Sequence, residues 1–224
     1  MMSINLKDIT KKYSQKTVLE SVNISFEEGR CIGILGENGC GKTTLLSILS
    51  GVLIPDSGEF WYGGSDLIKD TKLRQSVVGY IPQGTPLIEE FTAYENLCMW
   101  YSKEQISNSV ENGVIGMLGI KDFMDVPVKK MSGGMKKRLS IACGVHHDPK
   151  LLIMDEPTAA LDMPCREKIY TYFKDYIKRG NSIIIATHEA REIELCDELY
   201  ILKHGNCVRY EYDGNIVHLV GQLR

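Results

Sequence analysis

The stretch Gly36-Glu-Asn-Gly-Cys-Gly-Lys-Thr-Thr44 decides the fold predicted for this chain. An apolar run, Cys31-Ile-Gly-Ile-Leu35, precedes it, and a run typical of a helix, Leu45-Leu-Ser-Ile-Leu49, follows it. The stretch matches the pattern G-x-x-x-x-G-K-[ST] in the strand, loop and helix context that a phosphate-binding loop requires. We therefore expect an α/β fold of the P-loop NTPase kind.

The residues of this loop have separate expected roles. Its glycines allow the backbone to turn successive N–H groups toward an anion, and the following helix adds its positive end. Lys42 is expected to reach the β- and γ-phosphates, and Thr43 offers a hydroxyl to Mg²⁺, which prefers a few protein oxygens plus substrate phosphates. The predicted nucleotide contacts are Gly36, Asn38, Gly39, Cys40, Gly41, Lys42, Thr43 and Thr44. The loop alone leaves the kind of NTPase open.

Length and composition limit the alternatives. The 224 residues, 43% of them apolar and 25% charged, suit one α/β domain with an inserted lobe. The net charge of −3 argues against nucleic acid as the main partner. Seven cysteines without C-x-x-C spacing argue against a metal cluster and fit a reducing cytosol. We see no signal peptide and no apolar run of roughly 18 residues, so a membrane role would come through a partner.

The pattern of apolar residues changes along the chain. Alternation from Ser3 to Phe26 predicts antiparallel strands with a turn at residues 14–16. Helical spacing between about Gly84 and Met131 predicts a mainly helical lobe. A helix with Ser132 as its N-cap should follow and stop near Asp148, before Pro149. The last portion, from Leu199 to Leu202 and from Val208 to Val220, is predicted as strands.

Polar residues follow two apolar runs that are typical of buried parallel strands. Asp155 and Glu156 follow Leu151-Leu-Ile-Met154, and His188 follows Ser182-Ile-Ile-Ile-Ala-Thr187. Ligands of open α/β sheets bind outside the carboxyl ends of the strands. We expect Asp155 to help hold Mg²⁺ beside Thr43. Glu156 is expected to polarise a water molecule for attack on the γ-phosphate, and His188 to position that water.

The order and spacing of these motifs resemble the nucleotide-binding subunits of ATP-binding cassette (ABC) transporters over almost the whole chain. Besides the phosphate loop, the resemblance rests on Gln83, Met131-Ser-Gly-Gly-Met135, Leu152-Ile-Met-Asp-Glu156, Ala160-Leu-Asp162 and His188. It implies one ATPase domain over residues 1–224. The ATP-binding core with an antiparallel β subdomain would span 1–84 and 131–224, and a helical subdomain would span 85–130.

The resemblance also implies further site residues. Tyr13 occupies the place where an aromatic ring stacks on adenine, and Gln83 would act at the Mg²⁺ and at the attacking water. Two subunits of this family enclose two ATP molecules head to tail, as a homodimer or a heterodimer. Ser132, Gly133 and Gly134 would then bind the ATP held by the partner, with Asp162 close to the same nucleotide.

The signature departs from the commonest family pattern at Met135, where glutamine is usual. Methionine cannot donate a hydrogen bond to ribose, so one nucleotide contact is in doubt. The Ser-Gly-Gly-Met version resembles a branch of exporters of lipids, drugs or antibiotics, which implies export. The basic residues around the signature suit either a solvated face or a surface that attracts phosphate; they are Lys129, Lys130, Lys136, Lys137 and Arg138.

The resemblance implies a cytoplasmic ATPase, peripheral on the inner face of the cell membrane through a separate permease subunit. The contact with that subunit is expected in a groove beside Gln83, with Glu89, Phe91 and Tyr94 exposed. Two other functions stay open from the sequence. One is a soluble ABC ATPase in translation, chromosome or iron–sulfur assembly work, and the other is a nucleotide-sensing regulatory module.

Overall fold

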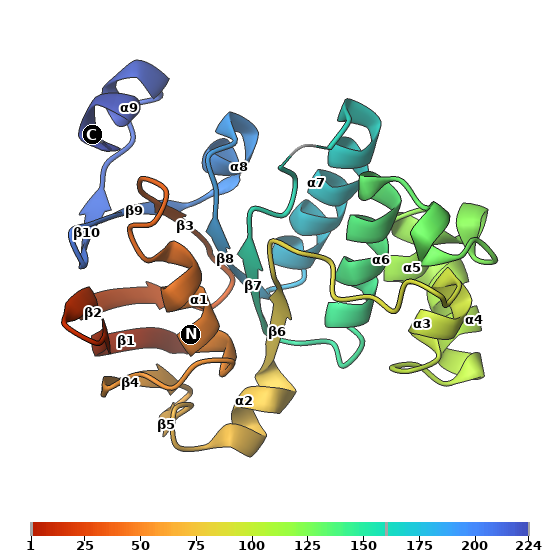
Figure 1. Ribbon diagram of the computed structural model, residues 1–224, viewed down its shortest axis with the longest axis horizontal. Helices are drawn as coiled ribbons and strands as arrows, with labels where there is room; N and C mark the ends of the chain where they lie inside the picture. Colours follow the sequence, from red (N-terminus) through yellow and green to blue (C-terminus); the bar gives the residue numbers. More distant parts are fainter. Residues whose placement is uncertain (1, 160, 224) are drawn as a thin grey trace.

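The structure is a computed structural model that describes residues 2–159 and 161–223. Its first sheet is antiparallel, with the strand order β2-β1-β4-β5 (Figure 1). These strands are β1 (Ser3–Tyr13), β2 (Lys16–Glu27), β4 (Ser57–Tyr62) and β5 (Ser65–Asp66). Apolar and polar residues alternate along parts of β1 and β2, and pairs such as Leu6 with Ile24 bury one face of the sheet. The predicted turn at residues 14–16 lies between β1 and β2.

The second sheet carries the phosphate loop at the end of one of its inner strands. Its order is β10-β9-β3-β8-β7-β6, and all neighbours are parallel except β10 with β9. The strands are β3 (Cys31–Leu35), β6 (Val78–Ile81), β7 (Leu151–Asp155), β8 (Ser182–Ala186), β9 (Glu198–Lys203) and β10 (Asn206–Tyr210). Since β3, β8 and β7 are adjacent and parallel, the residues that follow them meet at one edge.

The inner strands are apolar on both faces because both faces are covered. Ile32 and Ile184 pack with helix α1 (Lys42–Ser50) and with the antiparallel sheet. Leu152 and Ile183 face the opposite way and pack with helices α6 (Gly133–Gly144) and α7 (Met163–Lys178). Helix α1 therefore lies in a core shared by the two sheets, with the phosphate loop at its start.

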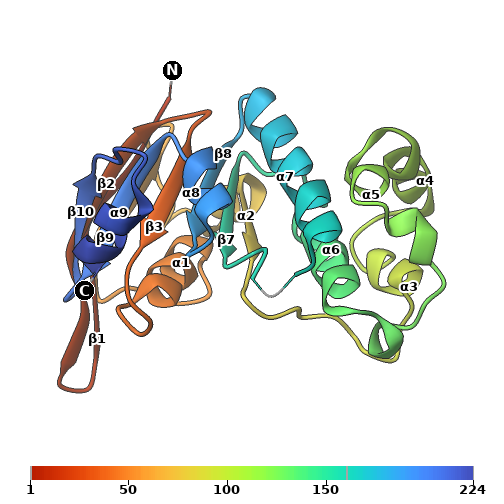
Figure 2. The same ribbon diagram turned by 90° about the horizontal axis from the view of Figure 1, so that it is seen from above.

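The helical lobe lies on the side of α6 and α7 away from the strands (Figure 2). It contains α3 (Ala93–Leu97), α4 (Lys103–Asn112) and α5 (Val114–Met117), with 3₁₀ turns at Ile120–Phe123 and Val128–Lys130. Reciprocal capping boxes start α3 and α4, at Thr92 with Glu95 and at Ser102 with Gln105. The prediction of a mainly helical lobe is confirmed. Among the described residues, no helix is long and apolar enough to cross a membrane.

The strands predicted up to Val220 are wrong beyond Tyr210. The structure instead has a helix, α9 (Ile216–Leu223), with Leu219 buried. Its apolar residues 216, 219, 220 and 223 follow helical spacing. The helix starts where Asn215 Oδ1 accepts a hydrogen bond from the Val217 N–H, 2.9 Å away. Helix α9 therefore begins directly after Asn215.

One helix boundary and two short helices also differ from the predictions. Helix α6 ends at Gly144, before the predicted stop near Asp148. A helix that the pattern did not predict, α2 (Thr71–Val77), begins where Asp70 Oδ1 accepts the Leu73 N–H at 3.0 Å. Another, α8 (Ala190–Leu195), follows His188 and brings its own buried residues against β3. Both unpredicted helices are short, and short helices give little periodic signal.

Candidate functional site

The phosphate loop connects β3 to α1. Two of its glycines have backbone conformations in which any other residue would be strained. Gly36 has φ +155°, and a Cβ atom there would collide with the carbonyl oxygen of Leu202 on β9. Gly41 has φ +116° and forms the N-cap of α1. The positive end of α1 and the loop N–H groups are thus available to an anion.

Lys42 lies inside this loop with its side chain 6% exposed. Its Nζ donates to the carbonyl oxygens of Gly36 at 2.7 Å and Glu37 at 3.1 Å. These bonds hold the ammonium group within the curve of the loop. A buried cation held by neutral carbonyl oxygens suits an anionic ligand, because a phosphate would compensate its charge.

Thr43 and Asp155 meet beside the loop. The Thr43 hydroxyl donates to Asp155 Oδ2 at 2.7 Å, and the Asp155 side chain lies at the end of β7 and is buried. A hydroxyl and a carboxylate are oxygen donors of the kind that Mg²⁺ accepts alongside substrate phosphates. The residues present therefore fit the magnesium site expected from the sequence.

Glu156 lies between two polar side chains from other parts of the chain. Gln83 Nε2 donates to Glu156 Oε2 at 3.0 Å, and His188 Nε2 lies 3.6 Å from Glu156 Oε1. Glu156 has φ +46°, a strained backbone conformation of the kind that clusters at functional sites. Burial and the Lys42 charge lower the pKa of His188, against the opposing effect of Glu156, so the imidazole is neutral at pH 7.

A cavity of about 420 Å³ joins the loop to these carboxylates. Its lining residues are Val18, Asn38, Gly39, Gly41, Lys42, Thr43, Thr44, Gln83, Asp155 and Glu156. Sequence reasoning missed Val18, whose only signal was its place in an alternating strand. Cys40 instead packs against the core and lines a neighbouring cavity of about 380 Å³. His188 lines another cavity, of about 640 Å³, between the loop and α9.

The other predicted nucleotide contacts lie outside the lining of the 420 Å³ cavity. Tyr13 is 48% exposed at the end of β1. Ser132 caps α6 by accepting the Met135 N–H at 3.2 Å, and Asp162 caps α7 by accepting the Cys165 N–H at 2.8 Å. Ala160 lies outside the described residues.

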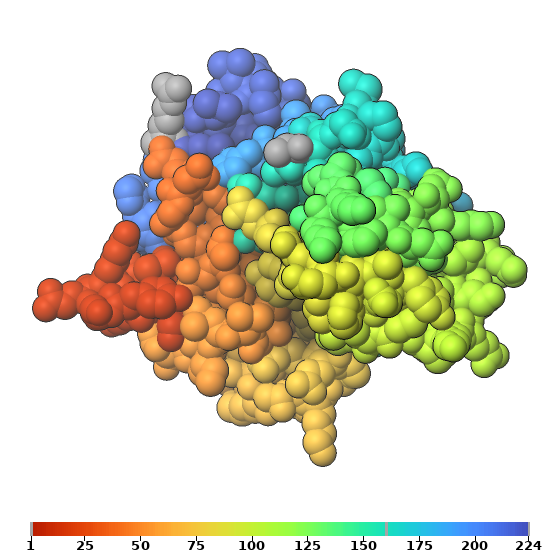
Figure 3. Space-filling model, turned by 45° about the vertical axis from the view of Figure 1, so that its right-hand side comes forward, coloured from red at the N-terminus to blue at the C-terminus, as the bar shows by residue number. Residues whose placement is uncertain are grey.

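The start of α6, which carries the signature residues, lies beside the start of α7 at Asp162. Cys165 Sγ donates to the Gly134 carbonyl oxygen at 3.4 Å, and a Cβ atom on Gly134 would press on that sulfur. Gly133 and Ser132 are exposed. On the molecular surface, the phosphate-loop segment, the segment after β6 and the start of α6 face the same side (orange, yellow and green in Figure 3).

The basic residues near the signature do not form one solvated face. Lys137 is buried, and its Nζ donates to the carbonyl oxygens of Pro82 at 2.7 Å and Gln83 at 3.2 Å. Burial lowers its pKa to about 8. Arg138 donates to the Leu118 carbonyl oxygen at 2.7 Å. The solvated-face reading is wrong for Lys137, because its charge is used inside the molecule to hold the Gln83 segment.

The fold and this site define a P-loop nucleotide-binding domain of the α/β class. The sequence pattern that describes the family "ABC transporter" matches residues 19–159, and the chain belongs to that family. The Nod factor export ATP-binding protein I of Sinorhizobium fredii is 34% identical over 91% of this chain and 61% of its own length. The linearmycin resistance ATP-binding protein LnrL of Bacillus subtilis is 32% identical over 92% of this chain and 68% of its own length.

Solved structures agree with the fold. A nucleotide-free ATP-binding cassette from an ABC transporter superposes with a TM-score of 0.85 at 22% identity, over 99% of this chain and 96% of that chain. A dimeric cassette in a post-hydrolysis state, bound to ADP and Pi, gives a TM-score of 0.83 at 28% identity, over 93% of this chain and 97% of that chain. The predicted α/β class, with an antiparallel β part and a helical part, is confirmed.

Proposed function

We propose that this chain is the ATP-hydrolysing subunit of an ABC exporter and drives a separate membrane permease. The observation that carries the proposal is the placement of Glu156. Its carboxylate contacts Gln83 and approaches His188, next to the Thr43–Asp155 pair. Such an arrangement offers a base, an orienting amide and a neutral imidazole around one position beside the phosphate loop.

The proposed reaction is attack of water on the γ-phosphorus of ATP. Lys42 and the loop N–H groups bind the β- and γ-phosphates, while Thr43, Asp155 and Gln83 would hold Mg²⁺, which would neutralise phosphate charge. The water oxygen bonds to the γ-phosphorus, and the bond between that phosphorus and the oxygen shared with the β-phosphate breaks. Glu156 accepts a proton from the water in this step. Neutral His188 orients the γ-phosphate by hydrogen bonding. The products are ADP and inorganic phosphate.

Tyr13 is proposed to stack on adenine at the outer end of this site. Its ring is exposed at the end of β1, and Val18, which follows the turn after it, lines the cavity. An exposed aromatic ring is available for stacking on a base. Asn38, Gly39, Cys40 and Thr44 would contact the nucleotide through the loop backbone.

The active form is proposed to be a twofold dimer that encloses two ATP molecules. Ser132, Gly133 and Gly134 are accessible at the start of α6, on the same side of the molecule as the phosphate loop (Figure 3). Twofold pairing would bring each signature, and the neighbouring Asp162, to the ATP of the other subunit. The partner is a second copy or a related subunit. ATP bound between them stabilises the closed state, and hydrolysis releases it.

The proposed location is the cytoplasmic face of the cell membrane, where the chain binds the permease as a peripheral subunit. The contact is assigned to the helical subdomain, residues 85–130, beside Gln83. Glu89 and Phe91 are exposed there, whereas Tyr94 is half-buried and packs against the core. The names of the relatives, Nod factor export and linearmycin resistance, favour export over import.

The decisive experiment compares the wild-type chain with Glu156→Gln. We expect magnesium-dependent ATP hydrolysis by the wild type and a loss of at least about 100-fold in the variant, with ATP binding retained. Gel filtration with ATP should show a stable dimer of the variant. Normal hydrolysis by the variant would overturn the assignment of the base.

Affinity purification from membranes tests the transport role. A polytopic membrane protein should co-purify with the wild-type chain, and its recovery should fall for Phe91→Asp, which places a charge on the proposed contact. Recovery of ribosomes or an assembly scaffold would support the soluble ATPase alternative. ATP binding without turnover would support the regulatory module.

A further inference from the structure

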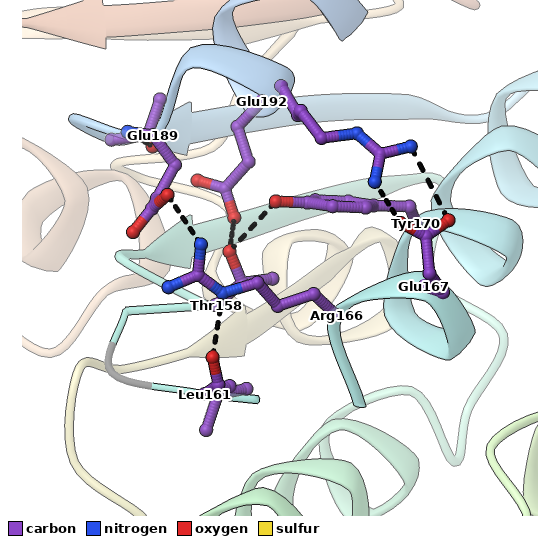
Figure 4. A network of polar contacts seen from close by, with 9 residues as sticks. Thr158, Leu161, Arg166, Glu167, Tyr170, Glu189 and Glu192 are labelled. Atoms are coloured by element: carbon purple, nitrogen blue, oxygen red, sulfur yellow. Dashed lines mark hydrogen bonds and ion pairs between the residues drawn. The ribbon is translucent and has the colours of Figure 1, made fainter. Parts of the chain in front are cut away.

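Glu192 is a carboxylic acid inside the protein, on helix α8, and nothing in the proposed reaction uses it. Its side chain is fully buried. One oxygen, Oε1, accepts a hydrogen bond from the Thr158 hydroxyl at 2.5 Å (Figure 4). The other oxygen, Oε2, has no hydrogen-bond partner among the described residues. Burying an acid with so few partners costs free energy, so its place requires a compensating role.

Charges around Glu192 do not form an ion pair with it in the described part of the chain. Arg166 reaches toward this region from α7, but it pairs with Glu189 at 2.8 Å and donates to the Leu161 carbonyl oxygen at 2.8 Å. Tyr170 contributes only its hydroxyl, 3.3 Å from Thr158 Oγ1. Burial therefore raises the pKa of Glu192, although the nearby Thr158 and Thr187 hydroxyls oppose the rise.

The hydroxyl groups around Glu192 belong to the two segments that carry the proposed reaction groups. Thr158 follows Glu156 by two residues at the end of β7. Thr187 immediately precedes His188, and its hydroxyl accepts the Glu189 N–H at 2.9 Å at the start of α8. Glu192 lies one turn further along α8. One side chain thus joins the segment of Glu156 to the helix that follows His188.

A second set of contacts runs parallel to this link. Arg166 connects Glu189, which follows His188, to Leu161, which precedes Asp162 (Figure 4). The Glu156 N–H also donates to the Ala186 carbonyl oxygen at 2.9 Å, close to the end of β8. These contacts fix the course of the backbone in these segments. The Glu192–Thr158 hydrogen bond, by contrast, fixes the distance between a side chain of α8 and a side chain of the segment after Glu156.

We propose that Glu192 is a positioning residue that holds the Glu156 and His188 segments at their working separation during ATP hydrolysis. It touches neither the cavity nor the phosphate loop, so it acts through Thr158 and α8. The inference rests on the proposed function, because Glu192 would support the roles in ATP hydrolysis that the proposed function assigns to Glu156 and His188. A displacement of about 1 Å between reacting groups can lower a rate by about 100-fold.

Four single variants of the whole chain and one double variant test this role. Glu192→Leu removes the acceptor and keeps an apolar side chain, and Thr158→Val removes the donor. Glu192→Gln keeps Oε1 and resembles the neutral acid that burial favours. Glu194→Leu, on the exposed side of the same helix, is the matched control. The measurements are kcat and KM for magnesium-ATP, with the melting temperature of each variant.

We expect Glu192→Leu and Thr158→Val to lower kcat by about 10- to 100-fold and to leave KM within about twofold. Glu192→Gln should keep at least about half of the wild-type kcat, and Glu194→Leu should match the wild type. The double variant Glu192→Leu with Thr158→Val should lose no more than the worse single variant, because both break one link.

Three results would overturn the inference while leaving the proposed function intact. They are an unchanged kcat for Glu192→Leu, a loss in Glu192→Gln as large as in Glu192→Leu, and multiplicative losses in the double variant. Absence of ATP hydrolysis by the wild type would overturn the proposed function instead, and the inference with it. A fall in kcat without a change in KM, together with the retained activity of Glu192→Gln, distinguishes a positioning role from a simple loss of folded protein.

Discussion

Thr43 Oγ1 lies 2.7 Å from Asp155 Oδ2, although 112 positions of the sequence separate the two residues. Thr43 lies in the first turn of the helix after β3, and Asp155 ends β7, two strands away in the sheet. The parallel order of β3, β8 and β7 brings them together. The contact links the phosphate loop to the strand that ends just before Glu156, the proposed base.

Replacing Asp155 with Asn should weaken the magnesium site. Asn keeps an acceptor for Thr43 but removes the negative charge that attracts the cation. We expect the Mg²⁺ concentration for half-maximal hydrolysis to rise by at least about tenfold, as measured by titration of ATPase activity. Asp148→Asn, at an exposed carboxylate, is the control. An unchanged Mg²⁺ requirement would show that Asp155 is not part of the magnesium site.

Replacing Lys137 with Met should loosen the Gln83 segment. The carbonyl oxygens of Pro82 and Gln83 would lose a charged donor, at a cost of about 1–3 kcal/mol in the free energy of unfolding. The neighbouring Lys136→Met should cost less than about 0.5 kcal/mol, because Lys136 pairs with the exposed Glu89 carboxylate. Urea unfolding of the two variants measures the difference, and equal stabilities would contradict it.

Alkylation of Cys40 should block nucleotide binding, and ATP should protect against it. Cys40 is half-buried in the phosphate loop and lines the 380 Å³ cavity beside it. The experiment follows ATPase activity during treatment with N-ethylmaleimide, with and without ATP. Cys40→Ala is the control, since exposed Cys98 will also react. Equal inactivation of this variant would assign the sensitivity to another thiol.

The stability of Glu192→Gln relative to the wild type should depend on pH. Burial raises the pKa of Glu192 above its ordinary value of 4.5, so the folded state retains a proton that the unfolded state has lost. That contribution is fully present below pH 4.5 and is lost as the pH rises through the raised pKa. We expect Glu192→Gln to gain stability relative to the wild type between pH 4 and pH 8. A constant difference in urea unfolding would contradict the raised pKa.

The sequence predicted those parts of the fold whose evidence is local. The phosphate loop, the buried strands before Asp155 and His188, and the helical lobe all have short patterns that specify them. The strand prediction for the C-terminal segment is wrong because the apolar residues at 216, 219, 220 and 223 follow helical spacing. Asn215 gave the correct signal, since its side chain starts the helix.

Local sequence patterns could not predict which charged side chains are buried. Lys137 and Glu192 are charged residues on helices, where exposure is the ordinary expectation. Their true surroundings depend on segments more than 30 positions away, the Gln83 segment for Lys137 and Thr158 for Glu192. The roles assigned to Tyr13, Ser132 and Asp162 stay predictions, because each depends on a nucleotide or a second subunit.

The contact of Lys137 with the Gln83 segment gives the molecule a short mechanical linkage. Lys137 belongs to the helix that begins at the signature, and the Gln83 side chain reaches Glu156 at 3.0 Å. We expect a tilt of α6 to move the Gln83 backbone through Lys137, and the Gln83 side chain to pass that movement to the Glu156 carboxylate. Helix α6 and Glu156, the proposed base, are thus connected through Lys137 and Gln83, so we expect a displacement of α6 to change the rate of the proposed ATP hydrolysis.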